Sequence, residues 1–249
     1  MAMVWKKQLS GVLYEVRSAG KTLRLYTDGV FHSQYNPDRP VTGHVWDLLM
    51  LPAFFYSEYD IKRVLVMGVA GGAVLHLLRQ FTTVEKIVGV ELNSQHVSIG
   101  RRFFNLQAAP IELVEADAID WLKSYQGEPF DMIIDDLFAE EEGEPVAVVK
   151  ADTSWFSYML KHLTDQGVIV RNFINKRELL ESAGLKHGAT RRQFKSVFQF
   201  TSQFNENFVA AYLRKTASSR MLRSRLVKIP GLNPQLKTSR LRYKVRQLI

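Results

Sequence analysis

Apolar positions follow two different patterns along the chain, and the change between them divides it. Residues 11–17 and 22–26 alternate moderately between apolar and polar side chains and are joined by a turn-like segment. The pair Asp28-Gly29 is a second hairpin signal before residues 30–35. From residue 63 onwards, short apolar runs rich in β-branched residues alternate with helical segments instead. The pattern predicts a small β region in residues 1–40 and an α/β domain in residues 41–213.

The α/β domain is expected to hold one open sheet. Its first helix spans about residues 44–55, with a break near Pro52. Parallel strands are predicted at 63–67, 86–90, 111–114, 130–134 and 168–173, with helices between them, and Ser94 is the expected N-cap of one helix. Two last strands, 196–201 and 207–213, are separated only by residues 202–206 and should form a hairpin. The sequence therefore predicts a Rossmann-like α/β fold with a mostly parallel seven-stranded sheet and a C-terminal antiparallel hairpin.

The charge of the chain is unevenly distributed. The net charge is +8, yet residues 214–249 hold 11 of the 33 Lys and Arg residues and no Asp or Glu, so the preceding residues carry a net charge of −3. We treat residues 214–249 as a basic C-terminal tail. Two readings of it stay open: contact with nucleic acid or anionic lipid, and docking of a solvated tail on the mildly acidic body.

Composition excludes several classes of protein. The chain has no cysteine, which rules out a disulfide framework and a thiolate nucleophile or metal site. No apolar run approaches the roughly 20 residues that a membrane span needs. The N-terminus lacks the apolar region of a signal peptide, so a cytoplasmic location is the simplest expectation.

A glycine-rich turn follows the first predicted parallel strand. It reads Gly68-Val69-Ala70-Gly71-Gly72-Ala73 and leads into a helix. Glycine allows the backbone to turn tightly and to approach a ligand, and the start of a helix offers unpaired N–H groups. Glu91 ends the next strand, where an acidic residue binds the two hydroxyls of a ribose. Together the two features predict a nucleotide site.

Further acidic residues follow the third and fourth strands. Asp117 is placed to accept an adenine amino group beside the N–H of Ala118, and Asp136 lies where the reactive end of a ligand would project. Each acid alone is also explained as a helix cap or a solvated loop residue, and for Asp117 the cap is a strong alternative. The combination at successive strand ends favours a site. The predicted cofactor-binding residues are Gly68, Val69, Ala70, Gly71, Gly72, Glu91, Leu92, Asp117, Ala118 and Asp136.

These residues resemble the spermidine synthase family, which shares the fold of S-adenosylmethionine-dependent methyltransferases. The resemblance covers residues 10–213 and includes Leu25-Tyr26-Thr27-Asp28-Gly29-Val30-Phe31-His32-Ser33 ahead of the α/β block. It implies that the glycine loop cradles the methionine part of the nucleoside, that Glu91 binds ribose and Asp117 adenine, and that Asp136 handles an amine substrate. It also implies a homodimer, with the N-terminal hairpins near the interface.

The departures from the family pattern concern the polyamine half of the site. The family's loop, G-G-G-D-G-G, has an Asp where this chain has Gly71, and the family's Y-H-E reads Gly43-His44-Val45. That Asp helps to hold the ammonium of decarboxylated S-adenosylmethionine, whereas the amino-acid end of S-adenosylmethionine suits backbone N–H groups. After the fourth strand only Asp136 remains of the family's D-S-S-D-P. We therefore expect a spermidine synthase-like, S-adenosylmethionine-dependent methyltransferase with an unknown acceptor.

Asp136 is the expected catalytic residue, because it could orient or deprotonate the acceptor. Weaker substrate candidates are His44, Asp135 and Asn172. Asp136 and Asn172 also resemble metal ligands of catechol O-methyltransferase, but Arg171 stands in the third ligand position, so no metal is expected. The acidic segment 140–144 is either a lid or a solvated loop.

Two alternative functions stay open. One is a polyamine aminopropyltransferase that uses decarboxylated S-adenosylmethionine. The other is a non-catalytic protein that binds a nucleoside, or nucleic acid through the basic tail.

Overall fold

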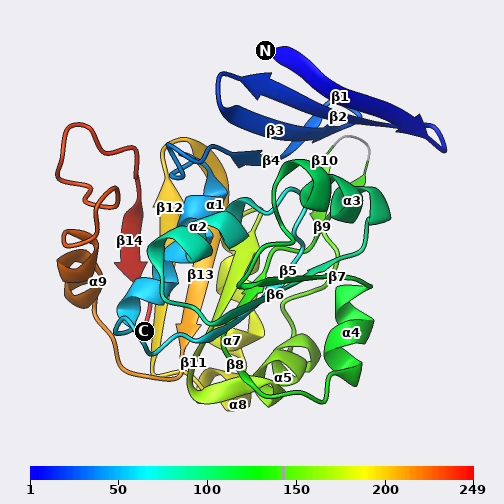
Figure 1. The fold of residues 1–249 in the computed structure, drawn as a ribbon. Helices are drawn as coiled ribbons and strands as arrows, with labels where there is room; N and C mark the ends of the chain where they lie inside the picture. Colours follow the sequence, from blue (N-terminus) through cyan, green and yellow to red (C-terminus); the bar gives the residue numbers. More distant parts are fainter. Residues whose placement is uncertain (142–143) are drawn as a thin grey trace.

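The computed structural model describes residues 1–141 and 144–249 and contains two main sheets (Figure 1). The smaller is a four-stranded antiparallel sheet in chain order, placed over one end of the larger sheet. Its strands are β1 (Ala2–Leu9), β2 (Val12–Ala19), β3 (Thr22–Thr27) and β4 (Val30–Tyr35). The predicted hairpin at Asp28-Gly29 joins β3 to β4, and Asp28 Oδ1 accepts a hydrogen bond from Leu13 N at 2.7 Å.

The larger sheet has eight strands in the order β14-β12-β13-β11-β8-β5-β6-β7. The strands from β11 to β7 pair in parallel, while β13, β12 and β14 pair antiparallel. This arrangement confirms the predicted α/β class, with one strand more than expected. The strands are β5 (Arg63–Met67), β6 (Lys86–Glu91), β7 (Ile111–Glu115), β8 (Phe130–Asp135), β11 (Leu163–Phe173), β12 (Ser196–Ser202), β13 (Asn205–Leu213) and β14 (Lys244–Gln247).

Helices cover both faces of the large sheet because its central strands are apolar on both sides. Along β5, Val64 and Val66 join one buried cluster, while Leu65 and Met67 join the other. The first cluster lies under α1 (Val45–Met50), the 3₁₀ helix η1 (Leu51–Phe55), α2 (Ala73–Phe81), α3 (Ser94–Phe103) and α9 (Ser219–Leu226). The second lies under α4 (Ala118–Ser124), α5 (Thr153–Lys161), α6 (Lys176–Glu181) and α7 (Ala183–Lys186), with α8 (Gly188–Arg191) beside α5 and α7.

Two local details differ from the sequence expectation. The N-cap of α3 is Asn93 rather than Ser94, because Asn93 Oδ1 accepts hydrogen bonds from the backbone N–H groups of residues 95 and 96. In the acidic segment, β9 (Phe138–Glu141) pairs with β10 (Glu144–Ala147) as a small antiparallel sheet. Residues 142–143 of the proposed lid lie outside the described part of the chain.

The basic C-terminal segment is folded against the body. It contributes α9 and the edge strand β14, which pairs with β12 and supplies the eighth strand of the sheet. The side chains of Leu222, Leu226, Leu232 and Leu241 are fully buried. Of the ion pairs described for the chain, one involves this segment, Arg214 Nη2 with Asp165 Oδ1 at 3.5 Å. Apolar burial rather than charge therefore docks the segment. The boundaries 1–40, 41–213 and 214–249 remain a prediction.

No helix in the described ranges is long and apolar enough to cross a membrane.

The docking of the C-terminal segment can be tested with one buried and one exposed leucine. We expect Leu241→Ala to lower the free energy of unfolding by about 2–4 kcal/mol, because it removes a fully buried side chain and leaves a cavity. Leu236, which is 53% exposed, is the matched control, and Leu236→Ala should change stability by less than about 0.5 kcal/mol. Urea unfolding followed by circular dichroism measures both. Equal effects of the two substitutions would contradict the packing described here.

Candidate functional site

The register of the parallel strands brings the predicted residues to one edge of the sheet. Met67 of β5 lies opposite Val90 of β6 on one side and Asp135 of β8 on the other. One step further on, Gly68 N donates to Val90 O at 3.0 Å, and Asp136 N donates to Met67 O at 3.0 Å. The edge continues to β7 on one side and β11 on the other. It thus carries Gly68, Glu91, Leu92, Asp117, Ala118, Asp136 and Asn172.

Gly68 allows the glycine loop to approach the end of β8 very closely. Its φ is +84°, and a Cβ atom there would lie 2.3 Å from the backbone oxygen of Asp136. Any side chain at this position would push the two strand ends apart. Glycine therefore sets the distance between the loop and Asp136.

Gly71 is enclosed by the N-terminal sheet. A Cβ atom at this position would lie 2.8 Å from the Cβ of Ser33 in β4 and 3.3 Å from Cε1 of Phe104. Ser33 is fully buried, and its Oγ accepts a hydrogen bond from Ala73 N at 3.1 Å. It thereby caps helix α2, whose own N-cap residue, Gly72, has no side chain. Position 71 consequently leaves no room for the carboxylate that the family pattern places there.

Glu91 organises the glycine loop in this structure. Its Oε2 accepts hydrogen bonds from Val69 N at 3.0 Å and Ala70 N at 2.7 Å, and its Oε1 accepts one from Asn93 N at 2.8 Å. Ala70 is held with φ of 50°, a left-handed conformation that is strained for a residue with a side chain. The carboxylate compensates by binding the loop N–H groups as an anion would. Sequence reasoning assigned Glu91 to a ribose and did not predict this role.

Asp117 acts as the N-cap of α4, which was the alternative to adenine binding that the sequence left open. Its Oδ1 accepts hydrogen bonds from Ile119 N at 2.8 Å and Asp120 N at 3.1 Å, and the residue is exposed. Capping uses one carboxylate oxygen and leaves the other for a ligand. Leu92 is 70% exposed, whereas Ala118 is buried in the apolar cluster that lies under α4 and α5. An exposed leucine beside an exposed carboxylate suits a flat ring with an amino group.

Asp136 and Asn172 form a polar pair beside the glycine loop. Asn172 Nδ2 donates a hydrogen bond to Asp136 Oδ1 at 2.9 Å. Burial, reinforced by the neighbouring charge of Asp135, raises the pKa of Asp136 to about 6, although the hydrogen bond from Asn172 opposes the shift. Asn172 is 5% exposed, and its Oδ1 has no hydrogen-bond partner among the described residues. The pair thus presents a carboxyl group with a raised pKa and, among the described residues, an unpaired buried acceptor.

Asp135 is separate from this pair in its described contacts, and its substrate role stays a prediction. Its Oδ2 accepts hydrogen bonds from Arg171 Nη1 at 2.5 Å and from Trp155 Nε1 at 2.7 Å, and the residue is 2% exposed. Side chains alternate between the faces of a strand, so consecutive acids point to opposite faces. Asp135 is therefore a buried ion-pair partner that stabilises the end of β8.

His44 is also separate from the Asp136–Asn172 pair in its described contacts. Its ring lies 5.3 Å from that of Phe31 and 5.5 Å from that of Trp46, measured between centroids. Burial and the nearby charges of Arg24 and Arg240 lower the pKa of His44. The substrate role of His44 stays a prediction.

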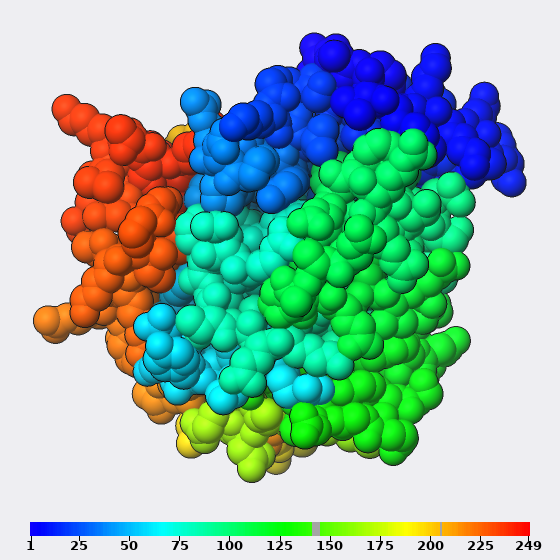
Figure 2. All heavy atoms as spheres, in the orientation of Figure 1, coloured from blue at the N-terminus to red at the C-terminus, as the bar shows by residue number. Residues whose placement is uncertain are grey.

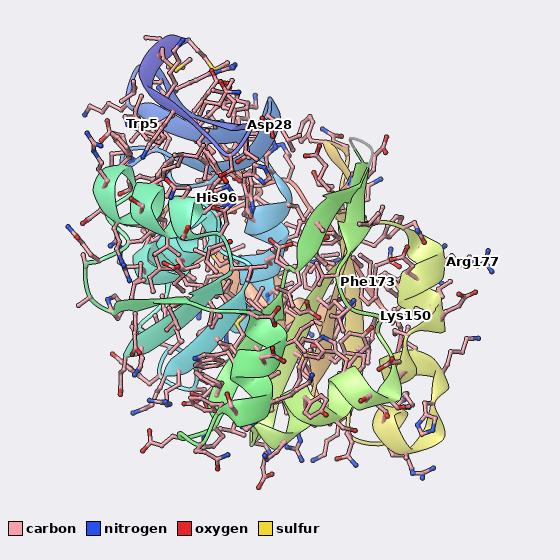
Figure 3. All side chains as sticks on the ribbon, turned by 90° about the vertical axis from the view of Figure 1, so that its right-hand side faces the viewer. Trp5, Asp28, His96, Lys150, Phe173 and Arg177 are labelled. Carbon is pink, nitrogen blue, oxygen red and sulfur yellow. The ribbon has the colours of Figure 1, made fainter. Side chains whose placement is uncertain are left out.

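Two histidines that sequence reasoning did not single out connect the N-terminal sheet to Glu91. Figure 3 shows His96 of α3 close beneath the N-terminal sheet. His96 Nε2 hydrogen-bonds Thr27 Oγ1 at 2.8 Å, and its Nδ1 lies 3.8 Å from Glu91 Oε1. The ring of His32 in β4 lies 5.1 Å from that of His96. In the sequence, the only sign of a role for either histidine was that His32 lies in the hairpin that is similar to the family's hairpin.

Burial disfavours the charged form of both histidines. Burial, with a smaller contribution from His96, lowers the pKa of His32 to about 4. Burial likewise lowers the pKa of His96, against the opposing effect of Glu91. The acid that holds the glycine loop therefore lies 3.8 Å from an imidazole whose charged form is disfavoured by burial.

Comparison with known sequences gives a consistent picture. The family model for the spermine/spermidine synthase domain matches residues 47–218. Polyamine aminopropyltransferase 2 of Caldanaerobacter subterraneus is 26% identical over 180 residues, covering 70% of this chain and 57% of that protein. Putrescine N-methyltransferase 2 of Nicotiana tabacum is 29% identical over 165 residues, covering 64% of this chain and 43% of that protein. The chain thus spans about half the length of these relatives.

Solved structures share the fold. A probable spermidine synthase from Corynebacterium glutamicum superposes with a TM-score of 0.73 at 14% identity, covering 99% of this chain and 90% of that one. Human methyltransferase-like protein 13, in complex with SAH, superposes with a TM-score of 0.56 at 17% identity, covering 78% of this chain and 95% of that one. The matched domain extends over more than half of the sequence, and on that ground the chain belongs to the spermine/spermidine synthase family.

Proposed function

We propose that this protein is an S-adenosylmethionine-dependent methyltransferase whose acceptor is an amine nitrogen. The observation that carries the proposal is the Asp136–Asn172 pair next to the glycine loop. The Asp136 carboxylate and the unpaired Oδ1 of Asn172 are both hydrogen-bond acceptors. A neutral primary amine supplies two N–H donors to such a pair, whereas a hydroxyl supplies only one.

The residues of the strand edge fit the cofactor. The close packing of Gly68 and Gly71 supports a loop that a nucleoside with an amino-acid end could approach, and the exposed Leu92 and Asp117 at the next strand ends, with Ala118, would hold its base. Glu91 would bind the ribose and would then give up part of its hydrogen bonding to the backbone N–H groups of Val69 and Ala70. The bound cofactor would supply a methyl group activated on a sulfonium.

The role of Asp136 follows from its pKa of about 6. Above that pH its carboxylate can accept a hydrogen bond from the amine and take up the proton released when the nitrogen forms its new bond to carbon. Asn172 orients the carboxylate through Nδ2 and would hold the second amine N–H through Oδ1. Positioning and proton removal are what methyl transfer requires of a protein.

The enclosure of Gly71 favours a methyl donor with an intact amino-acid end. Decarboxylated S-adenosylmethionine ends in a bare ammonium, which needs a nearby carboxylate. Ser33 and Phe104 close the space for one at position 71. The similarity to putrescine N-methyltransferases, at 28–29% identity, agrees with this choice.

Aminopropyl transfer is the second candidate function. It is favoured by the similarity to polyamine aminopropyltransferases, at 26% identity for two bacterial relatives. The acceptor in that reaction is also an amine, so the Asp136–Asn172 pair would serve both reactions. The two candidates differ in the group transferred.

A product assay distinguishes these candidates. The purified protein is incubated with putrescine, spermidine and simple monoamines, together with S-adenosylmethionine or its decarboxylated form, and products are identified by mass spectrometry. We expect methylated amine with the first cofactor and tighter binding of that cofactor by calorimetry. Aminopropylated product together with preference for the decarboxylated form would reverse the choice. Binding of neither nucleoside would favour the non-catalytic alternative.

The pH dependence of activity tests the role of Asp136. Because its pKa lies at about 6, kcat/KM should fall as the pH is lowered through that value. Asp136→Asn should reduce kcat by roughly 10²–10⁴-fold and remove this limb of the profile. Asp120→Asn, at an exposed position of α4, is the matched control and should leave the profile unchanged.

The stability of the same variant gives an independent check. A carboxyl group whose pKa is raised on folding stabilises the protein below its ordinary pKa, and this contribution is lost as the pH rises to about 6. Asp136→Asn should therefore be more stable than the wild type at pH 8, by on the order of 2–3 kcal/mol, and show no such gain at pH 4. A gain that persists at pH 4 would show that titration of Asp136 is not its cause.

A pair of substitutions tests the enclosure of Gly71. Gly71→Ala places a Cβ atom against Ser33, so it should lower the free energy of unfolding by about 1–3 kcal/mol and raise the dissociation constant for S-adenosylmethionine. In the background of Ser33→Gly, which removes the opposing Cβ, the same change should cost much less. A double-mutant cycle of unfolding and calorimetry measures this coupling. Additive effects would contradict the steric explanation.

A further inference from the structure

The folded C-terminal segment carries a set of exposed cations that the proposed chemistry does not use. All eight lie between the start of α9 and the end of β14, and the segment contains no acidic residue. Within the described residues, none of them forms an ion pair. We call this set the basic flank: Arg220, Arg223, Lys228, Lys237, Arg240, Arg242, Lys244 and Arg246.

The segment is positioned so that these charges face outwards. On α9, Leu222 and Leu226 are fully buried while Arg220 and Arg223 are exposed, and they lie three residues apart on one face of the helix. The helix packs beside β14 and against η1. Arg225, on its inner side, donates to the backbone oxygen of Phe54 at 3.3 Å. Apolar contacts thus hold the helix in place and leave its outer cations free for a partner.

Strand β14 and the residue pair before it repeat the separation of apolar and charged faces. Tyr243 and Val245 turn inwards, and the ring of Tyr243 lies 6.4 Å from that of Phe200. Arg242, Lys244 and Arg246 alternate with them and are exposed. Alternate residues of a strand share one face and repeat every ~6.6 Å, so Lys244 and Arg246 form a row on β14, and Arg242 precedes Lys244 by two residues. The row lies on the edge strand of the sheet.

The helix and the edge strand occupy the same flank of the molecule. In Figure 1 α9 and β14 lie together on the left, and Figure 2 shows the orange and red segment covering that margin of the surface. The rest of the chain, residues 1–213, has a net charge of −3. A polyanion would be attracted to this flank and repelled by much of the remaining surface.

We propose that the basic flank binds the phosphate backbone of nucleic acid. Five of its eight cations are arginines, whose planar guanidinium groups bind phosphate oxygens in pairs. A regular row on a rigid strand beside a basic helix suits a repeating anion. The proposal does not depend on the proposed function, since it uses a different surface.

An anionic membrane is the competing partner, and the structure disfavours it. A helix that binds a bilayer inserts its apolar face among the lipids. The apolar face of α9 is already buried in the protein through Leu222 and Leu226. The flank therefore offers charge without an apolar face to insert.

The binding is expected to be independent of base sequence. Tyr243 is the only aromatic residue of segment 214–249, and it packs inwards on Phe200. The described part of the flank thus has no exposed ring on which a base could stack. Recognition is through phosphate contacts, which make the affinity strongly dependent on salt.

Fluorescence anisotropy with the full chain tests the proposal. The probes are a labelled DNA duplex of about 20 base pairs and an RNA hairpin of similar length, titrated at salt concentrations from about 50 to 200 mM. Two other polyanions are tested in parallel. One is a vesicle that contains anionic lipid, and the other is free poly-glutamate. We expect binding of both nucleic acids, weakening steeply with salt, and weaker binding of vesicles and poly-glutamate.

Charge-removing variants locate the surface. One triple variant carries Arg220→Gln, Arg223→Gln and Lys228→Gln, and a second carries Arg242→Gln, Lys244→Gln and Arg246→Gln. Each should raise the dissociation constant about tenfold or more and make the salt slope shallower by up to about 0.9 for each lost duplex phosphate contact. The matched control carries Lys161→Gln, Lys176→Gln and Lys186→Gln, three exposed lysines on other helices, and should change affinity by less than about twofold.

Thermal unfolding checks that the variants are folded. If the variant at positions 242, 244 and 246 does not fold, the variant at positions 220, 223 and 228 alone tests the proposal. Equal loss of affinity in the control would show that net charge rather than this surface is responsible, and would overturn the proposal. So would tighter binding of vesicles or poly-glutamate than of duplex, or absence of nucleic-acid binding at about 50 mM salt.

Discussion

The close approach of the glycine loop to its neighbours is the constraint on which the site depends. On one side Gly68 lies against the backbone oxygen of Asp136, and on the other Gly71 lies against Ser33 of the N-terminal sheet. The loop is therefore held between the end of β8 and a separate sheet. Both contacts exist only because these positions have no side chain. They bring a candidate cofactor loop, a candidate base and the N-terminal sheet into one site.

Acidic side chains at the strand ends play different roles according to the direction in which each points. Asp135 and Asp136 are consecutive, yet Asp135 pairs with buried Arg171, whereas the side-chain hydrogen bond described for Asp136 comes from the neutral amide of Asn172. Successive side chains of a strand point to opposite faces. Asp135 therefore reaches Arg171, while Asp136 lies on the other face, where burial raises its pKa. Glu91 has yet another role, because its carboxylate satisfies the N–H groups of a strained loop. A ligand that binds at Glu91 would therefore also act on the conformation of the loop.

In the C-terminal segment, apolar and charged residues have separate roles. Its leucines complete the core beneath α9 and its last strand completes the sheet, while its cations stay at the surface. Charges on an edge strand also discourage pairing with another sheet edge. Arg220 and Arg223 lie on α9 and not on that edge strand, so protection of the edge does not account for them.

The sequence by itself determined the α/β class, the chain order of seven strands of the large sheet, and the strand-end positions of Gly68, Glu91, Asp117 and Asp136. It could do so because apolar periodicity and glycine placement are local properties, and because parallel strands end at a common edge. Only the tertiary structure decided what each side chain does there. The cap at Asn93, the ion pair of Asp135, the enclosure of Gly71 and the burial of Leu241 all depend on residues distant in the chain. No local pattern records which distant residue lies opposite, and this is why the seven predicted strands did not include β14 of the C-terminal segment.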